Sequence, residues 1–343
     1  MKAALYEKEH TIRIVDRPIP QAGPGEAVIK IELCGICGTD LHIYYEGMFP
    51  PGFVPGHENV GTVYQLGEGV DGFHVGDRVA AGPPGSCGRC YYCVHGRPSL
   101  CLTAMSETNG LSRDGGFAEY MLVRDARQSL YPIPESVSFK DAVLTDTIAT
   151  ALRGIVQSAL RMGDNVVVSG CGPIGLSAVQ LLKLGGARHV TAIEVVERKR
   201  ALAAKLGADL VLDPLAGAET LPDRIRKLYN GVGADLAVEC AGVADSLGLC
   251  LALVRAGGQV LNLGAGGGPL PVVPAMLAVR EINLASSLAY TADEAKTVLA
   301  YLADGRFKTE GMVSDIIPLA DFVEQGLERL VADRSLVKVA VAP

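Results

Sequence analysis

A chain of 343 residues is long for a single compact core and is comfortable for two domains. Because 49% of the residues are hydrophobic and 20% are charged, the chain can bury a large core. The formal net charge of −7 argues against a nucleic-acid partner or an anionic membrane, since both attract a basic face. No apolar run approaches the roughly 20 residues that span a bilayer, and the first residues lack a signal peptide's apolar segment, so a cytoplasmic location is expected.

Residues 1–152 are predicted to form a β-rich domain, because short apolar runs alternate there with Gly and Pro turn signals. Strands are predicted over 27–31, 61–64 and 117–123. The predicted fold class of the whole chain is α/β, with this β-rich domain followed by a domain of a different kind.

From residue 153 apolar strands alternate with amphipathic helices, which predicts a doubly wound parallel sheet over 153–288. Its predicted strands are 166–168, 190–193, 209–212, 236–238 and 260–263, with helices over 176–184 and 198–206. A helix over 293–302 and a strand over 338–341 are expected to return to the first domain, so that 289–343 completes it.

A glycine-rich turn follows the first strand of the parallel sheet. Gly170, Gly172 and Gly175 match G-x-G-x-x-G, with Cys171, Pro173 and Ile174 between them. In this setting the glycines permit a tight turn and close backbone approach to a pyrophosphate, which the following helix N-terminus attracts. The pattern therefore predicts a dinucleotide site that includes Pro173 and Ile174, although a plain strand-to-helix turn is the alternative.

Glu194 ends the next strand, about 20 residues after the glycines, where an acid accepts hydrogen bonds from the ribose hydroxyls of NAD. Its charge would repel a 2′-phosphate, so NAD is expected rather than NADP. Lys199 and Arg200 follow a little later, and because they are basic, NADP remains an alternative to NAD. Lys199 is a further candidate contact to the cofactor. The alternative for Glu194 is a solvated side chain.

The nine cysteines are too clustered and odd in number for a disulfide framework. Cys87, Cys90, Cys93 and Cys101 form C-x2-C-x2-C-x7-C, a spacing that can close a tetrahedron of thiolates around zinc. Because four cysteine ligands leave no open position, this zinc is predicted to be structural. Redox or free thiols are the alternative.

Two further residues are candidate ligands of a catalytic zinc, which needs about three protein ligands and one open position. Cys37 lies in Cys34-Gly35-Ile36-Cys37-Gly38-Thr39-Asp40-Leu41-His42, and His57 lies in Gly56-His57-Glu58. A single histidine on a loop is more often a hydrogen-bonded surface residue. The cysteine cluster and the glycine-rich turn elsewhere in the chain favour the interpretation of Cys37 and His57 as zinc ligands.

With these motifs in place, the chain resembles the zinc-containing medium-chain dehydrogenases, which include alcohol, sorbitol, butanediol and threonine dehydrogenases. The stretch Gly56-His57-Glu58-x2-Gly61-x5-Gly67-x2-Val70 is similar to the zinc signature of that family. The resemblance covers the whole chain. It implies a GroES-like catalytic domain, an NAD-binding Rossmann domain, and one catalytic and one structural zinc per chain.

The resemblance also implies roles for single residues. It makes Cys37, His57 and Asp146 the ligands of the catalytic zinc, and Glu58 an acid that contacts the metal directly or through water. It makes Thr39 the hydroxyl that hydrogen-bonds the substrate oxygen and His42 the outer proton relay, although both are turn or surface residues in the alternative reading. Asp40 is expected to orient His57, and Cys34 is expected to be a core residue despite its C-x2-C spacing from Cys37.

The implied reaction moves a hydride between an alcohol and NAD, after the alcohol loses its proton. A small secondary alcohol or diol is the expected substrate, because the chain has no Trp and only 5% aromatic residues, and because Leu288-Ala289-Tyr290-Thr291 loosely resembles butanediol and polyol dehydrogenases. L-threonine 3-dehydrogenase, a sorbitol-type polyol dehydrogenase and a non-catalytic relative are the alternatives. Relatives assemble through the Rossmann domain, so a homodimer or homotetramer is implied.

Overall fold

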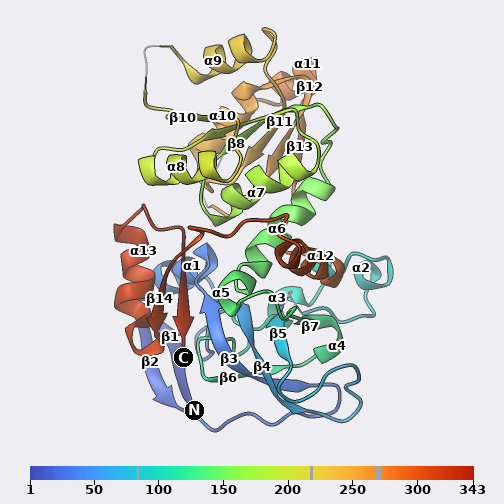
Figure 1. Cartoon of the computed structure of the whole chain (residues 1–343), viewed down its shortest axis with the longest axis vertical. Helices are drawn as coiled ribbons and strands as arrows, with labels where there is room; N and C mark the ends of the chain where they lie inside the picture. Colours follow the sequence, from blue (N-terminus) through green and yellow to red (C-terminus); the bar gives the residue numbers. More distant parts are fainter. Residues whose placement is uncertain (83–84, 217–218, 267–271) are drawn as a thin grey trace. The chain divides into compact units, whose positions relative to one another are not determined.

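The computed structural model describes residues 1–82, 85–216, 219–266 and 272–343. The chain forms two compact units: residues 1–149 combine with 289–343 in the first, and residues 150–288 form the second. In Figure 1 the blue and red ends of the chain share the first unit, and the green to orange middle forms the second. The domain bounds predicted from the sequence are residues 152 and 288.

The first unit is built on a seven-stranded sheet in the order β14-β15-β3-β4-β5-β7, with β6 also paired to β3. Its strands are β3 (Ala27–Gly35), β4 (Glu58–Leu66), β5 (Arg78–Ala81), β6 (Tyr120–Val123), β7 (Leu130–Pro132), β14 (Val313–Pro318) and β15 (Lys338–Ala342). A second sheet pairs β1 (Lys2–Lys8) with β2 (Thr11–Asp16). Because β15 pairs with the end of β3, the C-terminal segment completes the N-terminal sheet.

Short helices connect these strands. They are α1 (Gly38–Glu46), α2 (Tyr91–Val94), α3 (Ala104–Glu107), α4 (Ala126–Ser129), α5 (Phe139–Ala142), α12 (Ala292–Ala303) and α13 (Arg329–Ala332). Two 3-10 turns, η1 (Pro98–Leu100) and η2 (Leu319–Asp321), and a π-helical segment, η3 (Phe322–Glu328), complete the set. Helix α6 (Thr145–Val156) begins in the first unit and continues into the second.

The core of the first unit gathers side chains from both ends of the chain. Ile29 of β3, Phe117 and Phe322 are fully buried, together with Val339 and Val341 of β15. Each such side chain contributes roughly 1.5–3 kcal/mol when it leaves water. This shared core fixes the end of β3, from which the chain runs directly into α1.

The second unit is a six-stranded parallel sheet in the order β10-β9-β8-β11-β12-β13. Its strands are β8 (Asn165–Ser169), β9 (His189–Ile193), β10 (Leu210–Leu212), β11 (Ala234–Glu239), β12 (Val254–Asn262) and β13 (Asn283–Ser286). Its helices are α7 (Pro173–Leu184), α8 (Glu197–Lys205), α9 (Leu221–Leu228), α10 (Ala244–Leu253) and α11 (Pro274–Arg280). The strand order reverses between β8 and β11, which is the switch point where such sheets bind ligands.

The predicted fold class is confirmed, and the differences are local. The strand predicted over 117–123 begins only at Tyr120, because Ala118 forms just an isolated bridge with Ala3. Strand β12 begins at Val254, ahead of the predicted 260. Helix α1 lies in the part of the chain that was predicted as β-rich, and its capping box at Cys37 explains why a helix forms there.

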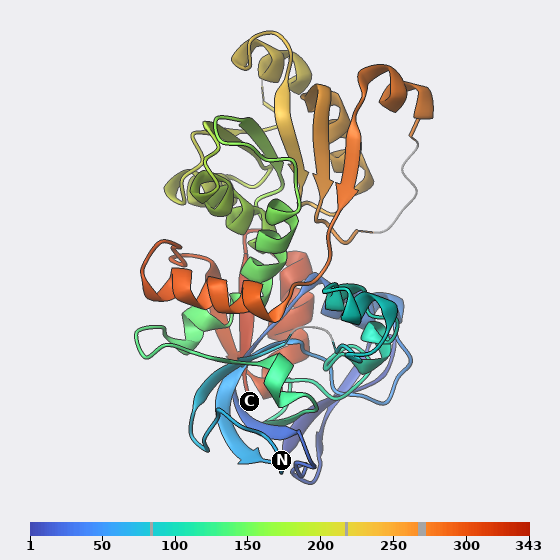
Figure 2. The ribbon, with the colours of Figure 1, turned by 90° about the vertical axis from the view of Figure 1, so that its right-hand side faces the viewer.

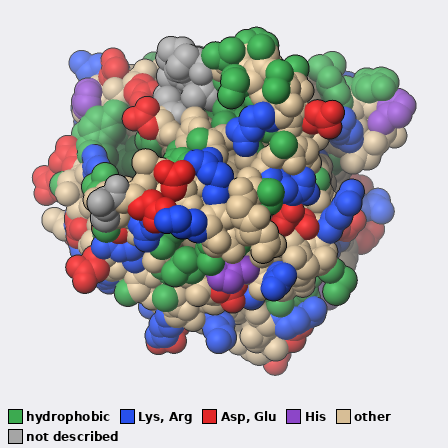
Figure 3. Space-filling model, turned by 90° about the horizontal axis from the view of Figure 1, so that it is seen from above, with side chains coloured by type: hydrophobic (Ala, Val, Ile, Leu, Met, Phe, Trp, Pro, Cys, Tyr) green, Lys and Arg blue, Asp and Glu red, His purple; other side chains and the backbone are tan. Residues whose placement is uncertain are grey.

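The face of the molecule in Figure 3 carries charges of both signs, because its Lys and Arg side chains are interspersed with Asp and Glu. Strand β13 is the last strand of the parallel sheet, and the orange segment that holds α11 and β13 lies at one side of the second unit in Figure 2. Among the described residues, no helix has both the length and the apolar character that crossing a membrane requires.

Candidate active site

The start of α1 positions Cys37 and Thr39 at the end of β3. Cys37 is the N-cap, and its backbone N–H donates to Asp40 Oδ2 at 2.8 Å, while the Cys37 side chain accepts from the backbone of Asp40. This reciprocal box satisfies two N–H groups of the helix start and fixes the direction of the Cys37 sulfur. Thr39 Oγ1 lies 3.7 Å from that sulfur. A thiol and a hydroxyl are therefore held side by side.

His57 lies just before β4 with its ring between a carboxylate and a sulfur. Its Nδ1 is 4.0 Å from Asp40 Oδ1, and both atoms are buried without a hydrogen-bond partner among the described residues. The ring also hydrogen-bonds Cys37, and because Nδ1 has no partner this contact uses Nε2. His57 thus presents Nε2 toward Cys37 and Nδ1 toward Asp40, the orientation in which metal-bound histidines are held by a carboxylate.

Glu58, the first residue of β4, forms an ion pair with Lys338, which lies near the C-terminus of the chain. Lys338 Nζ donates to Glu58 Oε1 at 2.7 Å, to Oε2, and to the Ile36 carbonyl oxygen at 3.0 Å. Thr147 Oγ1 donates to Oε1 at 3.1 Å. The ion pair is almost fully buried, with side-chain exposures of 3% and 2%. Both oxygens of Glu58 are therefore engaged and its charge is neutralised.

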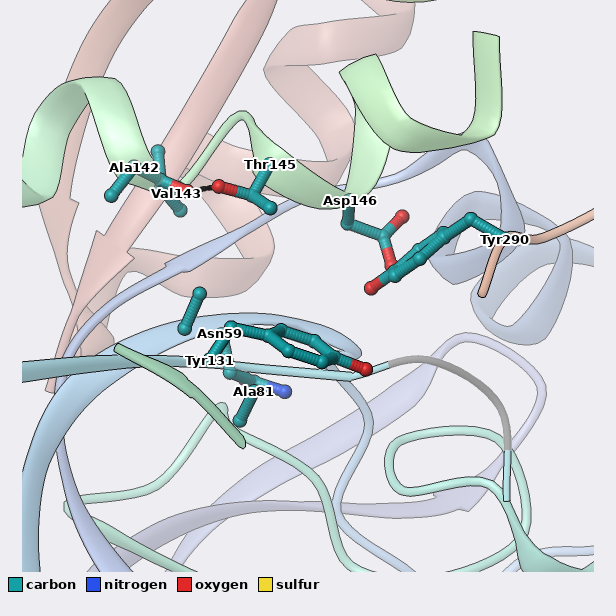
Figure 4. Close-up of a pocket in the computed structure, with 9 residues that line it drawn as sticks. Asn59, Ala81, Tyr131, Ala142, Val143, Thr145, Asp146 and Tyr290 are labelled. Carbon is teal, nitrogen blue, oxygen red and sulfur yellow. Dashed lines mark hydrogen bonds between the residues drawn. The ribbon is translucent and has the colours of Figure 1, made fainter. Parts of the chain in front are cut away.

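Asp146 lies in the first turn of α6, and the side chain of Tyr290 lies beside it (Figure 4). Burial, opposed in part by the charge of His57, raises the pKa of the Asp146 carboxyl to about 6. Figure 4 shows the two side chains facing each other, Asp146 from α6 and Tyr290 from the segment before α12. They line a tight pocket whose walls also include Asn59, Ala81 and Tyr131.

The ligand atoms of Cys37, His57 and Glu58 all lie within 4.8 Å of one another. Asp146 is outside that group, although its charge acts on His57. Burial opposes a charged imidazole, yet the Cys37 sulfur and the carboxylates of Asp40 and Asp146 raise the pKa of His57 well above its ordinary value. A buried, anionic set of sulfur, nitrogen and oxygen atoms is what a divalent cation satisfies, so these residues fit a zinc ion.

His42 lies one turn beyond Thr39 on α1. Its Nδ1 is 2.9 Å from Glu46 Oε1, and its side chain is 26% exposed. The side chain is therefore partly exposed, as a group that exchanges protons with solvent must be.

The four cysteines of the predicted structural site come together between β5 and β6. All four sulfur atoms lie within 4.8 Å of one another, and Cys90 Sγ is 3.5 Å from Cys93 Sγ. Burial opposes the thiolate of Cys101, but hydrogen bonds from Thr103 and the backbone of Cys87 lower its pKa to about 6. Four sulfurs at this separation fit a tetrahedral zinc.

The glycine-rich turn joins β8 to α7 in the second unit. Gly175 has no room for a side chain, because a Cβ there would lie 1.8 Å from the carbonyl oxygen of Gly170. Gly172 is the N-cap of α7 and Pro173 opens the helix, with Ile174 next in its first turn. The unpaired N–H groups of that turn and the helix dipole favour an anion such as a pyrophosphate.

Glu194 follows β9 and is 8% exposed. Its Oε2 accepts from the Cys171 N–H at 2.7 Å and its Oε1 from the Val196 N–H at 2.9 Å. Arg200 donates to the carbonyl oxygen of Glu194 and pairs with Asp213. Glu194 is thus tied to the glycine-rich turn, while the charge of Lys199 acts on Cys171 within the same turn.

Sequence reasoning missed two side chains of the first unit. Lys338 was predicted only as part of a closing strand, and Tyr290 only as part of a stretch after the parallel sheet. An isolated lysine at the start of the apolar run 338–341 was the available signal, because a charged residue that starts a buried strand needs a partner. Tyr290 was noted only within Leu288-Ala289-Tyr290-Thr291, for its similarity to butanediol and polyol dehydrogenases, and was given no role in the site.

Two family models match the chain. The alcohol dehydrogenase GroES-like domain matches residues 23–135, and the zinc-binding dehydrogenase domain matches residues 173–304.

Individual proteins match over the full length. D-arabinitol dehydrogenase 1 of Uromyces fabae is 33% identical, with 100% of this chain and 97% of the relative covered. The (R,R)-butanediol dehydrogenase of Bacillus subtilis is 31% identical, with 100% of both covered. A crystal structure described as a zinc-binding dehydrogenase of Sinorhizobium meliloti 1021, bound to NADP, superimposes with a TM-score of 0.91 at 32% identity and covers 100% and 99% of the two chains.

Proposed function

The chain belongs to the zinc-containing medium-chain dehydrogenase/reductase family, and we propose that within it this protein oxidises a small secondary alcohol or diol with NAD. Membership makes it a zinc-dependent, NAD(P)-linked alcohol oxidoreductase. The observation that carries the proposal is the group of Cys37, His57 and two carboxylates, of which Glu58 is buried and the others are partly buried, next to the Thr39 hydroxyl.

Cys37, His57 and Asp146 are the proposed ligands of the catalytic zinc. The choice between the two carboxylates rests on the hydrogen bonds of Glu58, whose two oxygens are both engaged by Lys338. Glu58 then acts close to the metal without being a permanent ligand. Cys87, Cys90, Cys93 and Cys101 hold the second, structural zinc.

Bound zinc would lower the pKa of an alcohol that reaches it, and NAD would take up the hydride, so that alcohol and NAD⁺ give ketone or aldehyde, NADH and a proton. The Thr39 hydroxyl orients the substrate oxygen and relays its proton, because it accepts that proton while its own hydroxyl proton passes on toward His42. His42, which reaches the surface, exchanges that proton with water. Asp40 holds His57 with Nε2 toward Cys37.

The glycine-rich turn from Gly170 to Gly175 and the start of α7 bind the pyrophosphate of the cofactor. Glu194, fixed beside that turn, has lone pairs left for the ribose hydroxyls and favours NAD. Lys199 is the proposed further contact. Because a structural relative was solved with NADP bound, the test below compares the activity with NAD and with NADP.

We also propose that the protein is a cytoplasmic homo-oligomer, a tetramer or a dimer. All nine cysteines are free thiols, and thiolate zinc sites suit a reducing compartment. Among the described residues β13 pairs only with β12, so it forms an edge of the parallel sheet, which suits pairing with a second copy.

The test is to follow NADH at 340 nm with ethanol, 2-propanol, 2,3-butanediol, sorbitol and L-threonine, each with NAD or NADP. The secondary alcohol or the diols are expected to react fastest, with NAD, and a zinc chelator is expected to abolish the reaction. Activity that survives removal of both zincs would contradict the zinc mechanism. Preference for L-threonine or NADP would overturn the proposed substrate or cofactor.

A further inference from the structure

Glu239 lies at the carboxyl end of β11, at the edge of the parallel sheet where the glycine-rich turn begins. Strands β8, β11 and β12 are neighbours in this sheet (Figure 1), and Glu239 is paired in register with Ser169, the last residue of β8. The Glu239 side chain is only 1% exposed. Because a buried carboxylate is costly unless hydrogen bonds satisfy it, its partners indicate what it holds in place.

The partners of Glu239 are backbone groups of the turn that follows β11. Its Oε1 accepts from the N–H of Ala241 at 2.7 Å and from the N–H of Gly242 at 2.9 Å. A carboxylate that binds the N–H groups two and three residues further along fixes the direction in which the chain turns. The turn after β11 is therefore held from inside the second unit by a single buried side chain.

The turn after β11 lies directly against the glycine-rich turn. A Cβ on Gly170 would lie 2.7 Å from the Ala241 nitrogen, so a side chain there would push the two backbones apart. On the other side, a Cβ on Gly264, in the chain after β12, would lie 2.2 Å from Oε2 of Glu239. The carboxylate of Glu239 thus lies where the turns after three adjacent strands meet.

The outer side of the turn after β11 is open to solvent. Ala241 is exposed and Val243 is 56% exposed, whereas the carboxylate of Glu239 is buried. Open α/β sheets bind dinucleotides outside the carboxyl ends of their strands, at the point where the strand order reverses. In this sheet that point lies between β8 and β11. The turn is therefore placed beside the proposed pyrophosphate site.

We propose that Glu239 is a positioning residue for the cofactor, whose carboxylate fixes the turn of residues 240–242 against the glycine-rich turn so that both backbones can approach the dinucleotide. This inference rests on the dinucleotide site proposed above. Glu239 acts through the turn and not by contact, because its carboxylate is buried and binds the N–H groups of that turn. Without this acceptor, cofactor binding must also order the turn, which weakens binding.

The test compares Glu239→Met, which keeps the length of the side chain without a carboxylate, with Glu239→Gln, which keeps an oxygen acceptor for the two N–H groups. The dissociation constant of NADH is measured by fluorescence titration, beside the melting temperature. Glu239→Met is expected to weaken NADH binding about 10-fold or more, the factor that corresponds to a hydrogen bond with a charged group. Glu239→Gln is expected to bind NADH within about 3-fold of wild type, because the acceptor remains.

Two further variants separate positioning from general stability. Asp235→Leu is the matched control, because Asp235 accepts from the Asn165 N–H at 2.8 Å near the opposite end of β11. It is expected to lower the melting temperature and to leave NADH binding unchanged. Gly264→Ala keeps Glu239 but displaces its carboxylate, so it is expected to weaken NADH binding and serves as the test if Glu239→Met does not fold.

The positioning role is wrong if Glu239→Met, or Gly264→Ala in its place, binds NADH as tightly as wild type does. It is also wrong if Asp235→Leu or Glu239→Gln weakens NADH binding as much as Glu239→Met does. A wild-type protein that binds neither NADH nor NADPH would instead overturn the proposed dinucleotide site itself.

Discussion

At the scale of single residues, the site depends on charges that are buried only because they have partners. The pair of Lys338 and Glu58 brings the two ends of the chain together at 2–3% exposure. A buried ion pair adds little net stability, but removal of one partner leaves an uncompensated charge in the core.

Lys338→Met is therefore expected to lower the free energy of unfolding by about 3–5 kcal/mol. Lys338→Met/Glu58→Gln should recover part of that loss, because no charge is then stranded. Lys183→Met is the control, since its partner Asp209 is partly exposed and water screens the pair. Urea unfolding of the four proteins measures these differences. If Lys338→Met and Lys183→Met lose equal free energy of unfolding, the claim that buried Glu58 depends on Lys338 for its charge partner is wrong.

The sequence offered candidate site residues where a motif holds them together. Cys37 and His57 follow the family pattern, and the four cysteines follow a metal-ligand spacing. Lys338 and Thr147 reach Glu58 only in the folded chain, and no local pattern encodes such contacts. The bond from Glu194 to the Cys171 N–H likewise depends on β9 lying beside β8.

At the scale of elements, apolar runs predicted the strands of the parallel sheet, because strands buried on both faces are continuously apolar. Helix α1 was not predicted, because one of its buried positions carries a charged residue. Its buried residues are Asp40, Ile43 and Tyr44, and Asp40 interrupts the apolar spacing. The carboxylate is there to cap the helix and to face His57. The local pattern was broken by a residue of the site.

Strand β13 and helix α11 are the elements for which we predict an intermolecular role. Met276, Val279, Leu284 and Leu288 are exposed there in the single chain. Leu284→Lys places a charge on the edge strand and is expected to shift the oligomer to monomer in sedimentation velocity. Leu215→Lys, at an apolar residue that is 82% exposed elsewhere in the second unit, should leave the assembly intact. Unchanged sedimentation of Leu284→Lys would place the interface elsewhere.

At the scale of the whole molecule, the chain leaves the first unit near residue 149 and returns at 289. The returning segment supplies Tyr290 and Lys338, so the proposed site is complete only when the N- and C-terminal parts have folded together. Composition and periodicity suggested two domains and a return of the C-terminal segment, but they did not say which strand that segment would pair with. The pairing of β15 with β3 is what accounts for it physically.

The central claim is that the first unit holds two zinc ions with separate tasks, and His57→Ala tests it most directly. Zinc per chain is measured by atomic emission, folding by circular dichroism, and NADH formation at 340 nm with the best alcohol. We predict a folded protein that keeps one zinc, held by the four cysteines, and forms no NADH. Loss of both zincs, retention of both, or NADH formation at the wild-type rate would contradict the division into a catalytic and a structural site.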